Sequence, residues 1–140
     1  MNPPLPPEAA YWNATADLYQ SETRISVDNF HYGPLLPGDN ELNLLPEKLK
    51  ATECLEVGCG AGQNSIVLAR RGARCTALDI ADRQLAIGGR LAAACGVDID
   101  FRCGDMDNLA DAELGHFDLI HSTYALPFSR RPQQVIASIS

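Results

Sequence analysis

The stretch that decides the fold is Leu55-Glu56-Val57-Gly58-Cys59-Gly60-Ala61-Gly62, an apolar run broken by one acid and followed by glycines at alternate positions. A helix-forming run from Ile66 to Arg71 follows, and a second apolar segment then ends in Asp79 and Ile80. This order predicts a strand, a tight glycine turn, a helix and a second strand with a carboxylate at its tip. Such a unit binds a nucleoside-containing cofactor at the carboxyl ends of parallel strands.

The glycines and Asp79 have separate tasks in such a unit. Glycine is needed where the backbone takes a positive φ or lies against a ligand with no Cβ in the way, and three glycines in five residues exceed what a turn requires. Asp79 follows Gly58 by 21 residues, close to the spacing of about 20 expected for the acid of the second strand. Its carboxylate is able to accept two hydroxyl hydrogen bonds from a ribose.

The spacing of the glycines indicates which cofactor is bound. In the dinucleotide pattern G-x-G-x-x-G/A the third position falls on Gln63, which disfavours a nicotinamide oxidoreductase. The pattern acid-x-G-x-G-x-G matches fully from Glu56 to Gly62. Here the sequence resembles the class I S-adenosylmethionine-dependent methyltransferases over about residues 52–128. The later motifs of that class follow in order as Asp79-Ile80, Gly104-Asp105-Met106 and the strand Phe117-Asp118-Leu119-Ile120-His121-Ser122.

The resemblance implies a role for each motif in holding S-adenosylmethionine. The glycine backbone would approach the methionine part, whose amino group Glu56 would anchor. Asp79 would hold the ribose, and Asp105 would accept a hydrogen bond from the adenine amino group. Side chains beside these acids would flank adenine, and the first turn of the following helix, with Gln63, would reach the carboxylate. The implied cofactor-binding residues are Glu56, Gly58, Cys59, Gly60, Ala61, Gly62, Asn64, Asp79, Ile80, Asp105, Met106, Ser122 and Tyr19.

The segment before the first strand predicts a helix at residues 8–20, with an apolar face formed by Tyr11, Trp12, Leu18 and Tyr19. In the methyltransferases that this chain resembles, such a helix caps the cofactor pocket, and the resemblance implies that Tyr19 lines it. His31 and Tyr32 stand before a Gly-Pro pair. Two interpretations remain for them: they reach the active site, or they belong to a packed loop.

The other periodic segments complete an α/β pattern. Strands are expected at 53–57, 74–79, 98–103 and 117–122, and helices at 41–45, 62–71, 82–95, 108–114 and from 130 onward. The alternation predicts a Rossmann-like three-layer α/β/α fold with a parallel sheet in the strand order 3-2-1-4. We expect three parts: a flexible proline-rich tail at 1–7, an N-terminal helical cap at 8–50 and an S-adenosylmethionine-binding domain at 51–140.

The pattern stops inside the helix after the fourth strand, whereas methyltransferases of this class usually have seven strands. The fold is therefore expected to be truncated after strand four, whose edge would be exposed. Three interpretations stay open. The chain is a fragment, it forms a homodimer through the fourth-strand edge, or a separate partner chain completes it.

Composition excludes several classes of function. The net charge is −7, with 18 acidic against 11 basic residues, which argues against nucleic acid as the main partner. No apolar run is long enough for a transmembrane helix, and the N-terminus lacks the pattern of a signal peptide, so no membrane association is expected. The five cysteines are odd in number and contain no CxxC pair, which predicts reduced thiols in the cytoplasm and no metal site.

The expected reaction is methyl transfer to a small-molecule acceptor by in-line displacement, for which the protein supplies alignment and desolvation. A base is needed only if the acceptor atom carries a proton, and His121 is one candidate, although a histidine at a strand end is more often structural. Ser122-Thr123-Tyr124-Ala125 departs from the Asp/Asn-Pro-Pro-aromatic sequence of enzymes that methylate amino groups. The alternative is a non-catalytic cofactor-binding module.

Overall fold

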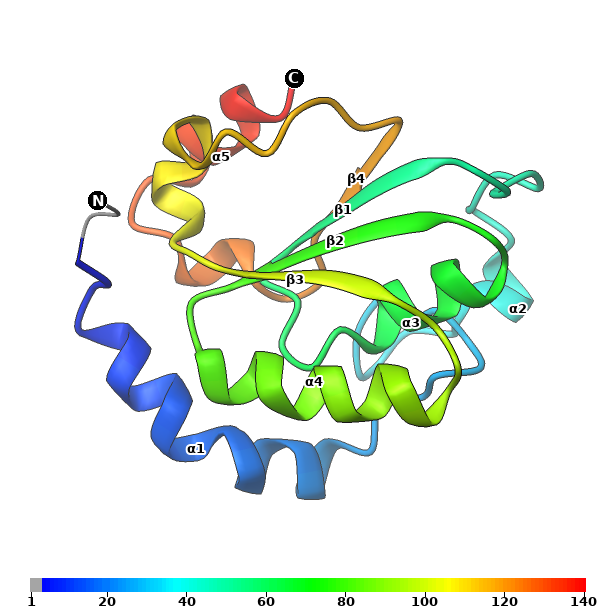
Figure 1. Ribbon diagram of the computed structural model, residues 1–140, viewed down its shortest axis with the longest axis horizontal. Coiled ribbons are helices and arrows are strands. Elements are labelled where there is room, and N and C mark those ends of the chain that lie inside the picture. Colours follow the sequence, from blue (N-terminus) through cyan, green and yellow to red (C-terminus); the bar gives the residue numbers. More distant parts are fainter. Residues whose placement is uncertain (1–3) are drawn as a thin grey trace.

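The structure is a computed structural model that describes residues 4–140, and its centre is a four-stranded, fully parallel sheet (Figure 1). The strands lie in the order β3-β2-β1-β4, as predicted. In the pairing of the strands, Glu56 of β1 lies between Ala77 of β2 and His121 of β4. The strands are β1 (Glu53–Val57), β2 (Arg74–Asp79), β3 (Ile99–Cys103) and β4 (Leu119–His121).

Helices cover both faces of the sheet, which confirms the Rossmann-like three-layer fold. Figure 1 shows α3 and α4 on one side and α5, with the neighbouring η1, on the other. This follows from right-handed crossovers, since β1 to β2 and β2 to β3 move in one direction and β3 to β4 moves back. The helices are α1 (Glu8–Thr23), α2 (Asp39–Leu42), α3 (Gln63–Arg70), α4 (Asp82–Ala94) and α5 (Pro132–Ser138), with 3₁₀ turns η1 (Met106–Ala112) and η2 (Leu126–Phe128).

Each face of the sheet has its own apolar core, because alternate residues of a strand point to opposite faces. On the α3 side, Cys54 of β1 packs with residues of α3 and with Phe30 and Leu49 from the segment before the sheet. On the other side, Leu55 and Val57 of β1 pack with residues of η1 and α5. The segment 8–50 therefore shares a core with the sheet. Residues 1–3 of the predicted tail lie outside the described residues.

The apolar face predicted for the first helix is wrong at Tyr11 and Leu18, whose side chains are 61% and 59% exposed. The helix buries Ala9 and Ala16 instead. Small side chains at these positions let the helix backbone lie close to the rest of the domain. α1 is held on α4 largely by polar contacts. The Arg83 guanidinium donates two hydrogen bonds to Asp17 at 3.0 and 3.1 Å.

The fourth strand is shorter than the predicted 117–122. The backbone hydrogen bonds between β1 and β4 end at His121. Beyond them, the Ser122 hydroxyl donates a hydrogen bond to the Val57 carbonyl oxygen at 2.7 Å. At the start of the strand, the Asp118 carboxylate accepts a hydrogen bond from the backbone N–H of Glu53 at 2.9 Å. Side chains of the strand-flanking residues thus fix the register of β4 against β1.

The two adjacent glycines of α4 give a test of how this helix packs on the glycine turn. A Cβ on Gly88 would stand 2.5 Å from the Ala61 carbonyl oxygen and 2.8 Å from the Phe101 ring, whereas a Cβ on Gly89 meets nothing within 4 Å. We expect Gly88→Ala to lower the free energy of unfolding by about 1–3 kcal/mol through overpacking. Gly89→Ala, the matched control, should raise it by about 0.5–1 kcal/mol. Urea denaturation measures both, and equal effects of the two substitutions would contradict this packing.

Candidate functional site

A cavity of about 620 Å³ lies at the carboxyl ends of the strands. Its wall combines the glycine turn after β1, the ends of β2 and β3, the face of α1, the loop at 31–34 and the segment after β4. This volume is typical of small-molecule sites, and the position at the point where the strand order reverses is the expected one for this class of sheet.

The glycine turn is built as its sequence predicts, with φ values of +71°, +58° and +73° at Gly58, Gly60 and Gly62. Gly58 and Cys59 donate backbone hydrogen bonds to the Leu78 carbonyl oxygen at 2.8 and 2.9 Å, which ties the turn to β2. A Cβ on Gly58 would stand 2.1 Å from the Ala125 side chain. On Gly60 it would meet only the amide ends of Gln20 and Gln84, at 3.8 and 4.0 Å. Gly60 is therefore the position at which the backbone is left open to the cavity.

Asp79 joins the turn to the end of β2. One carboxylate oxygen accepts the Gly60 N–H at 2.8 Å and the other accepts the Ala81 N–H at 2.9 Å. Burial raises the pKa of Asp79 above its ordinary value, and the backbone hydrogen bonds oppose that rise. Each oxygen keeps accepting capacity for a hydroxyl group in the cavity. The carboxylate thus fixes the turn and faces the ligand space.

Glu56 is buried beneath the turn, with 4% exposure. Its carboxyl accepts a hydrogen bond from the Ser65 hydroxyl at 2.7 Å, and its other oxygen lies 4.0 Å from Nδ1 of His121. Burial raises the pKa of Glu56 to about 8 and lowers the pKa of His121 to about 4. Neither ring nitrogen of His121 has a hydrogen-bond partner among the described residues. At neutral pH both groups are therefore mainly uncharged.

These two pKa values predict how stability depends on pH. Glu56 binds more protons when folded, so its contribution is complete below the unfolded pKa of about 4.5 and is lost as pH rises through about 8. His121 acts in the opposite sense, and its contribution is lost as pH falls from about 6.5 through about 4. Of these two groups, only Glu56 makes stability depend on pH above pH 6.5.

We therefore expect the free energy of unfolding to decrease between pH 6.5 and pH 8, by at most about 1.4 kcal/mol per pH unit. Glu56→Gln removes the titrating group and should flatten this dependence. Urea denaturation at pH 6.5, 7.2 and 8.0 measures both proteins. A slope that persists in the variant would show that another group is responsible.

Asp105 already has partners in the structure. One oxygen accepts the Asp107 N–H at 3.0 Å and the other accepts from the Arg130 guanidinium at 2.6 Å. Asp107 is bound by Arg130 at 3.0 Å and by the Ser129 hydroxyl. These ion pairs join η1 to the segment after η2 and fix the wall that contains Met106. A role of Asp105 in binding adenine therefore depends on its remaining accepting capacity.

The cavity brings together most of the residues that sequence reasoning selected. Asn64 lines it, but its amide is already paired with the backbone of His31, from N–H to Oδ1 and from Nδ2 to the carbonyl oxygen, both at 2.9 Å. Ala61, Gly62 and Ser122 lie outside the lining, because the first two are buried and the Ser122 hydroxyl donates to Val57. The selected residues that line the cavity are Glu56, Gly58, Cys59, Gly60, Asn64, Asp79, Ile80, Asp105, Met106 and Tyr19.

Sequence reasoning missed an amide relay that joins α1 to the turn. Gln63 donates to Gln20 at 2.5 Å, and Gln20 donates to Gln84 at 2.8 Å. It also missed Arg24, which among residues 4–140 is the only arginine or lysine that lines the cavity. No periodic signal marks these residues, since they meet only when α1 is placed on α4.

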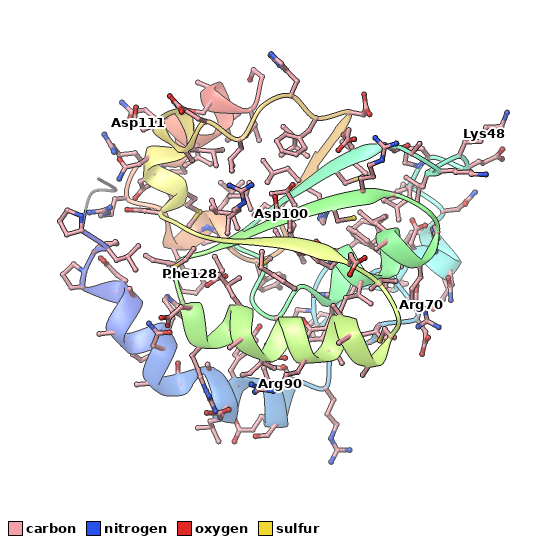
Figure 2. The ribbon with its side chains drawn as sticks, viewed as in Figure 1. Lys48, Arg70, Arg90, Asp100, Asp111 and Phe128 are labelled. Atoms are coloured by element: carbon pink, nitrogen blue, oxygen red, sulfur yellow. The ribbon has the colours of Figure 1, made fainter. Side chains whose placement is uncertain are left out.

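An aromatic cluster closes the α1 side of the cavity. Trp12 packs edge-on against Phe128 with ring centroids 5.1 Å apart and against Tyr19 at 6.5 Å. Figure 2 labels Phe128, which comes from η2, in the part of the chain that follows β4. The first helix and the segment after the last strand are therefore in contact over the site.

The fold and the site together define a Rossmann-like protein with a nucleoside-cofactor site, and comparison with known proteins identifies the family. The methyltransferase domain family matches residues 54–140. The chain belongs to this family, among the class I S-adenosylmethionine-dependent methyltransferases. Among the described residues no helix has the length and apolar character needed to cross a membrane.

Two curated relatives illustrate the similarity. The magnesium-protoporphyrin O-methyltransferase of Rhodobacter capsulatus is 36% identical over 92 residues, covering 65% of this chain and 40% of that protein. The ubiquinone biosynthesis O-methyltransferase of Idiomarina loihiensis is 33% identical over 82 residues, covering 59% of this chain and 34% of that protein. The matches thus span well under half the length of these two relatives.

Solved structures share the fold. The [4+2]-cyclase SpnF superposes with a TM-score of 0.70 at 22% identity, covering 99% of this chain and 56% of that protein. An S-adenosylmethionine-dependent methyltransferase from Clostridium acetobutylicum gives a TM-score of 0.64 at 20% identity, covering 93% and 52%. Because the first is described as a cyclase, the fold by itself does not define one reaction.

Proposed function

We propose that the chain binds S-adenosylmethionine in this cavity and that the protein transfers its methyl group to an oxygen atom of a small molecule. One observation carries the proposal: the glycine turn, the Asp79 carboxylate and the Glu56 carboxyl meet at one cavity, on neighbouring strands. The O-methyltransferase names of the curated relatives support oxygen as the acceptor atom.

The residues present fit the chemistry of this cofactor. The open backbone at Gly60 leaves room for the ligand, and Asp79 has accepting capacity for ribose hydroxyls. Ile80 and Met106 supply apolar surface for adenine. The carboxyl of Glu56 would accept a hydrogen bond from the amino group, whose positive charge favours ionisation of this carboxyl, and Arg24 would offset the negative charge of the carboxylate.

The cofactor supplies a sulfonium-bound methyl group that is already activated for transfer. The protein's own contribution is to hold the acceptor in line with that methyl group and to exclude water from the cavity. The amide relay holds α1 over the site. The glycine turn and Asp79 would position the nucleoside in the cavity. Most of the wall thus serves binding and alignment.

Arg24 gives a test of the cofactor's orientation. We expect Arg24→Gln to weaken S-adenosylmethionine binding by about 1.5–3 kcal/mol, because it removes a charge-assisted hydrogen bond. Decarboxylated S-adenosylmethionine lacks the group that Arg24 would hold, so the variant should bind this analogue as tightly as the wild-type protein does. Calorimetry with both ligands measures the difference. An equal loss for both ligands would contradict the assignment.

Turnover is tested by release of S-adenosylhomocysteine in the presence of hydroxyl, carboxyl and amino acceptors. The proposal predicts product with an oxygen acceptor. Binding of the cofactor without turnover on any acceptor would favour the alternative, a non-catalytic cofactor-binding module. Arg90 of α4, which is labelled in Figure 2, is not among the residues that line the cavity, so Arg90→Gln is a matched charge control for Arg24→Gln.

Two expectations from the sequence belong to this proposal. A cytoplasmic location is supported by five free cysteines, three of them buried. Homodimer formation through β4 is supported by the position of that strand at an edge of the sheet, where backbone groups are open to pairing.

A further inference from the structure

His31 occupies a special place in the cavity. It is the only one of the three histidines that lines the cavity: His121 is buried behind Glu56 and His116 is exposed. The backbone of His31 is held on both sides by the buried amide of Asn64, at 2.9 Å each. The ring itself makes no side-chain hydrogen bond among the described residues. The imidazole therefore keeps its hydrogen-bonding capacity for a ligand in the cavity.

The loop of His31 meets the segment after β4. The Asn64 amide that holds His31 also donates to the Thr123 hydroxyl at 3.4 Å. A Cβ on Gly33 would stand 2.4 Å from the Tyr124 ring, so this ring lies directly on the loop. Tyr124 has φ +61°, a conformation that costs about 1–2 kcal/mol for a residue other than glycine. The contact holds the ring, 59% exposed, at the cavity wall.

The contact between the His31 loop and the segment after β4 lies on the side of the cavity where the reacting end of the cofactor is expected. Asn64 lies in the first turn of α3 and Thr123 follows β4, so His31 stands over the crevice between β1 and β4. Adenine is assigned to the other side, between Ile80 and Met106. A cofactor bound in this way would direct its methyl group toward the wall that His31, Pro34 and Tyr124 form.

The charges of the cavity restrict the acceptor. Arg24, the one arginine or lysine in the described lining, is assigned to the cofactor's carboxylate, which leaves no permanent cation for an anionic acceptor. An uncharged hydroxyl fits this wall, and a hydroxyl has to lose a proton when it is methylated. Burial lowers the pKa of His31 below its ordinary value, so the imidazole is neutral and able to accept a proton at neutral pH. The Tyr124 ring and Pro34 offer a flat apolar surface, which suits an aromatic acceptor.

We propose that His31 is the general base for methylation of a hydroxyl group on an aromatic ring that lies against Tyr124 and Pro34. As the acceptor oxygen forms its bond to the methyl carbon, the carbon–sulfur bond breaks and its electron pair stays on sulfur, which becomes a neutral thioether. The hydroxyl proton passes to the unprotonated nitrogen of His31 and then to water. This inference rests on the proposed function and names its acceptor class and its base.

The test uses 4-nitrocatechol, a phenol whose ionisation changes its visible absorbance, added to the full chain with S-adenosylhomocysteine. At a pH where the free probe is protonated, the wild-type protein should give the phenolate band. His31→Ala should bind the probe without the band, and imidazole added to the solution should restore it. His31→Gln fills the space and should not be rescued. His116→Ala, an exposed histidine outside the cavity lining, is the control that keeps the band.

With S-adenosylmethionine in place of the product, the methyl-transfer rate of His31→Ala should fall by about 10²–10⁴-fold, with the cofactor affinity unchanged. A phenolate band that persists in His31→Ala would overturn the assignment of the base. Binding of S-adenosylhomocysteine without binding of the probe would overturn the acceptor class. Absence of S-adenosylhomocysteine binding would contradict the proposed function itself, so the failures are distinguishable.

Discussion

We expect Asp79→Ala to weaken S-adenosylmethionine binding by about 3 kcal/mol, on the order of a hundredfold in Kd. The substitution removes the acceptor of the ribose hydroxyls. It also releases the Gly60 N–H, which Asp79 holds at 2.8 Å, so the turn loses its fixed geometry. Calorimetric titration of the variant measures the loss.

Asp100 provides the control for this substitution. It lies on the exposed edge strand β3, where its carboxylate pairs with Arg102 at 2.8 Å, outside the cavity lining (Asp100 is labelled in Figure 2). Asp100→Ala removes the same charge and should leave cofactor affinity unchanged. Wild-type affinity in Asp79→Ala would end the assignment of Asp79 to the ribose.

The second large effect is expected for Gly60→Val, which should abolish detectable cofactor binding in a protein that still folds. A valine Cβ would project toward the ligand space, with only Gln20 and Gln84 near it, at 3.8 and 4.0 Å. Because position 60 has φ +58°, a valine there would be strained, and the free energy of unfolding should fall by about 1–2 kcal/mol.

Gly96→Val separates these two effects. Gly96 has φ +70° and nothing within 4 Å of its Cβ position, and it lies after α4, outside the cavity lining. The control should show a similar loss of stability by urea denaturation with no loss of cofactor affinity. If Gly60→Val bound S-adenosylmethionine as the wild-type protein does, the turn would not face the cofactor.

The sequence predicted the core of the site because that part is local. The two strands are predicted by the periodicity of their apolar residues, and the turn between them by the need for glycine at positive φ. Because the strands are parallel, their carboxyl ends, including Asp79, meet at one edge of the sheet. The same logic predicted the strand order 3-2-1-4, which the structure confirms.

The parts that sequence reasoning missed depend on side chains that are distant in the chain. Arg130 pairs with Asp105 from 25 residues away, and Gln20 meets Gln63 across 43 residues. The face of α1 was wrong because its spacing favoured large apolar residues, whereas the residues that the helix buries are the small Ala9 and Ala16. The periodicity of apolar residues within one segment carries no information about these distant partners.

The central claim is that the cavity binds S-adenosylmethionine, and calorimetric titration of residues 1–140 tests it most directly, with NAD titrated in parallel. The account predicts saturable binding of S-adenosylmethionine and none of NAD, because Gln63 occupies the third glycine position of the dinucleotide pattern. A folded sample that binds NAD, or that leaves S-adenosylmethionine unbound, would contradict it.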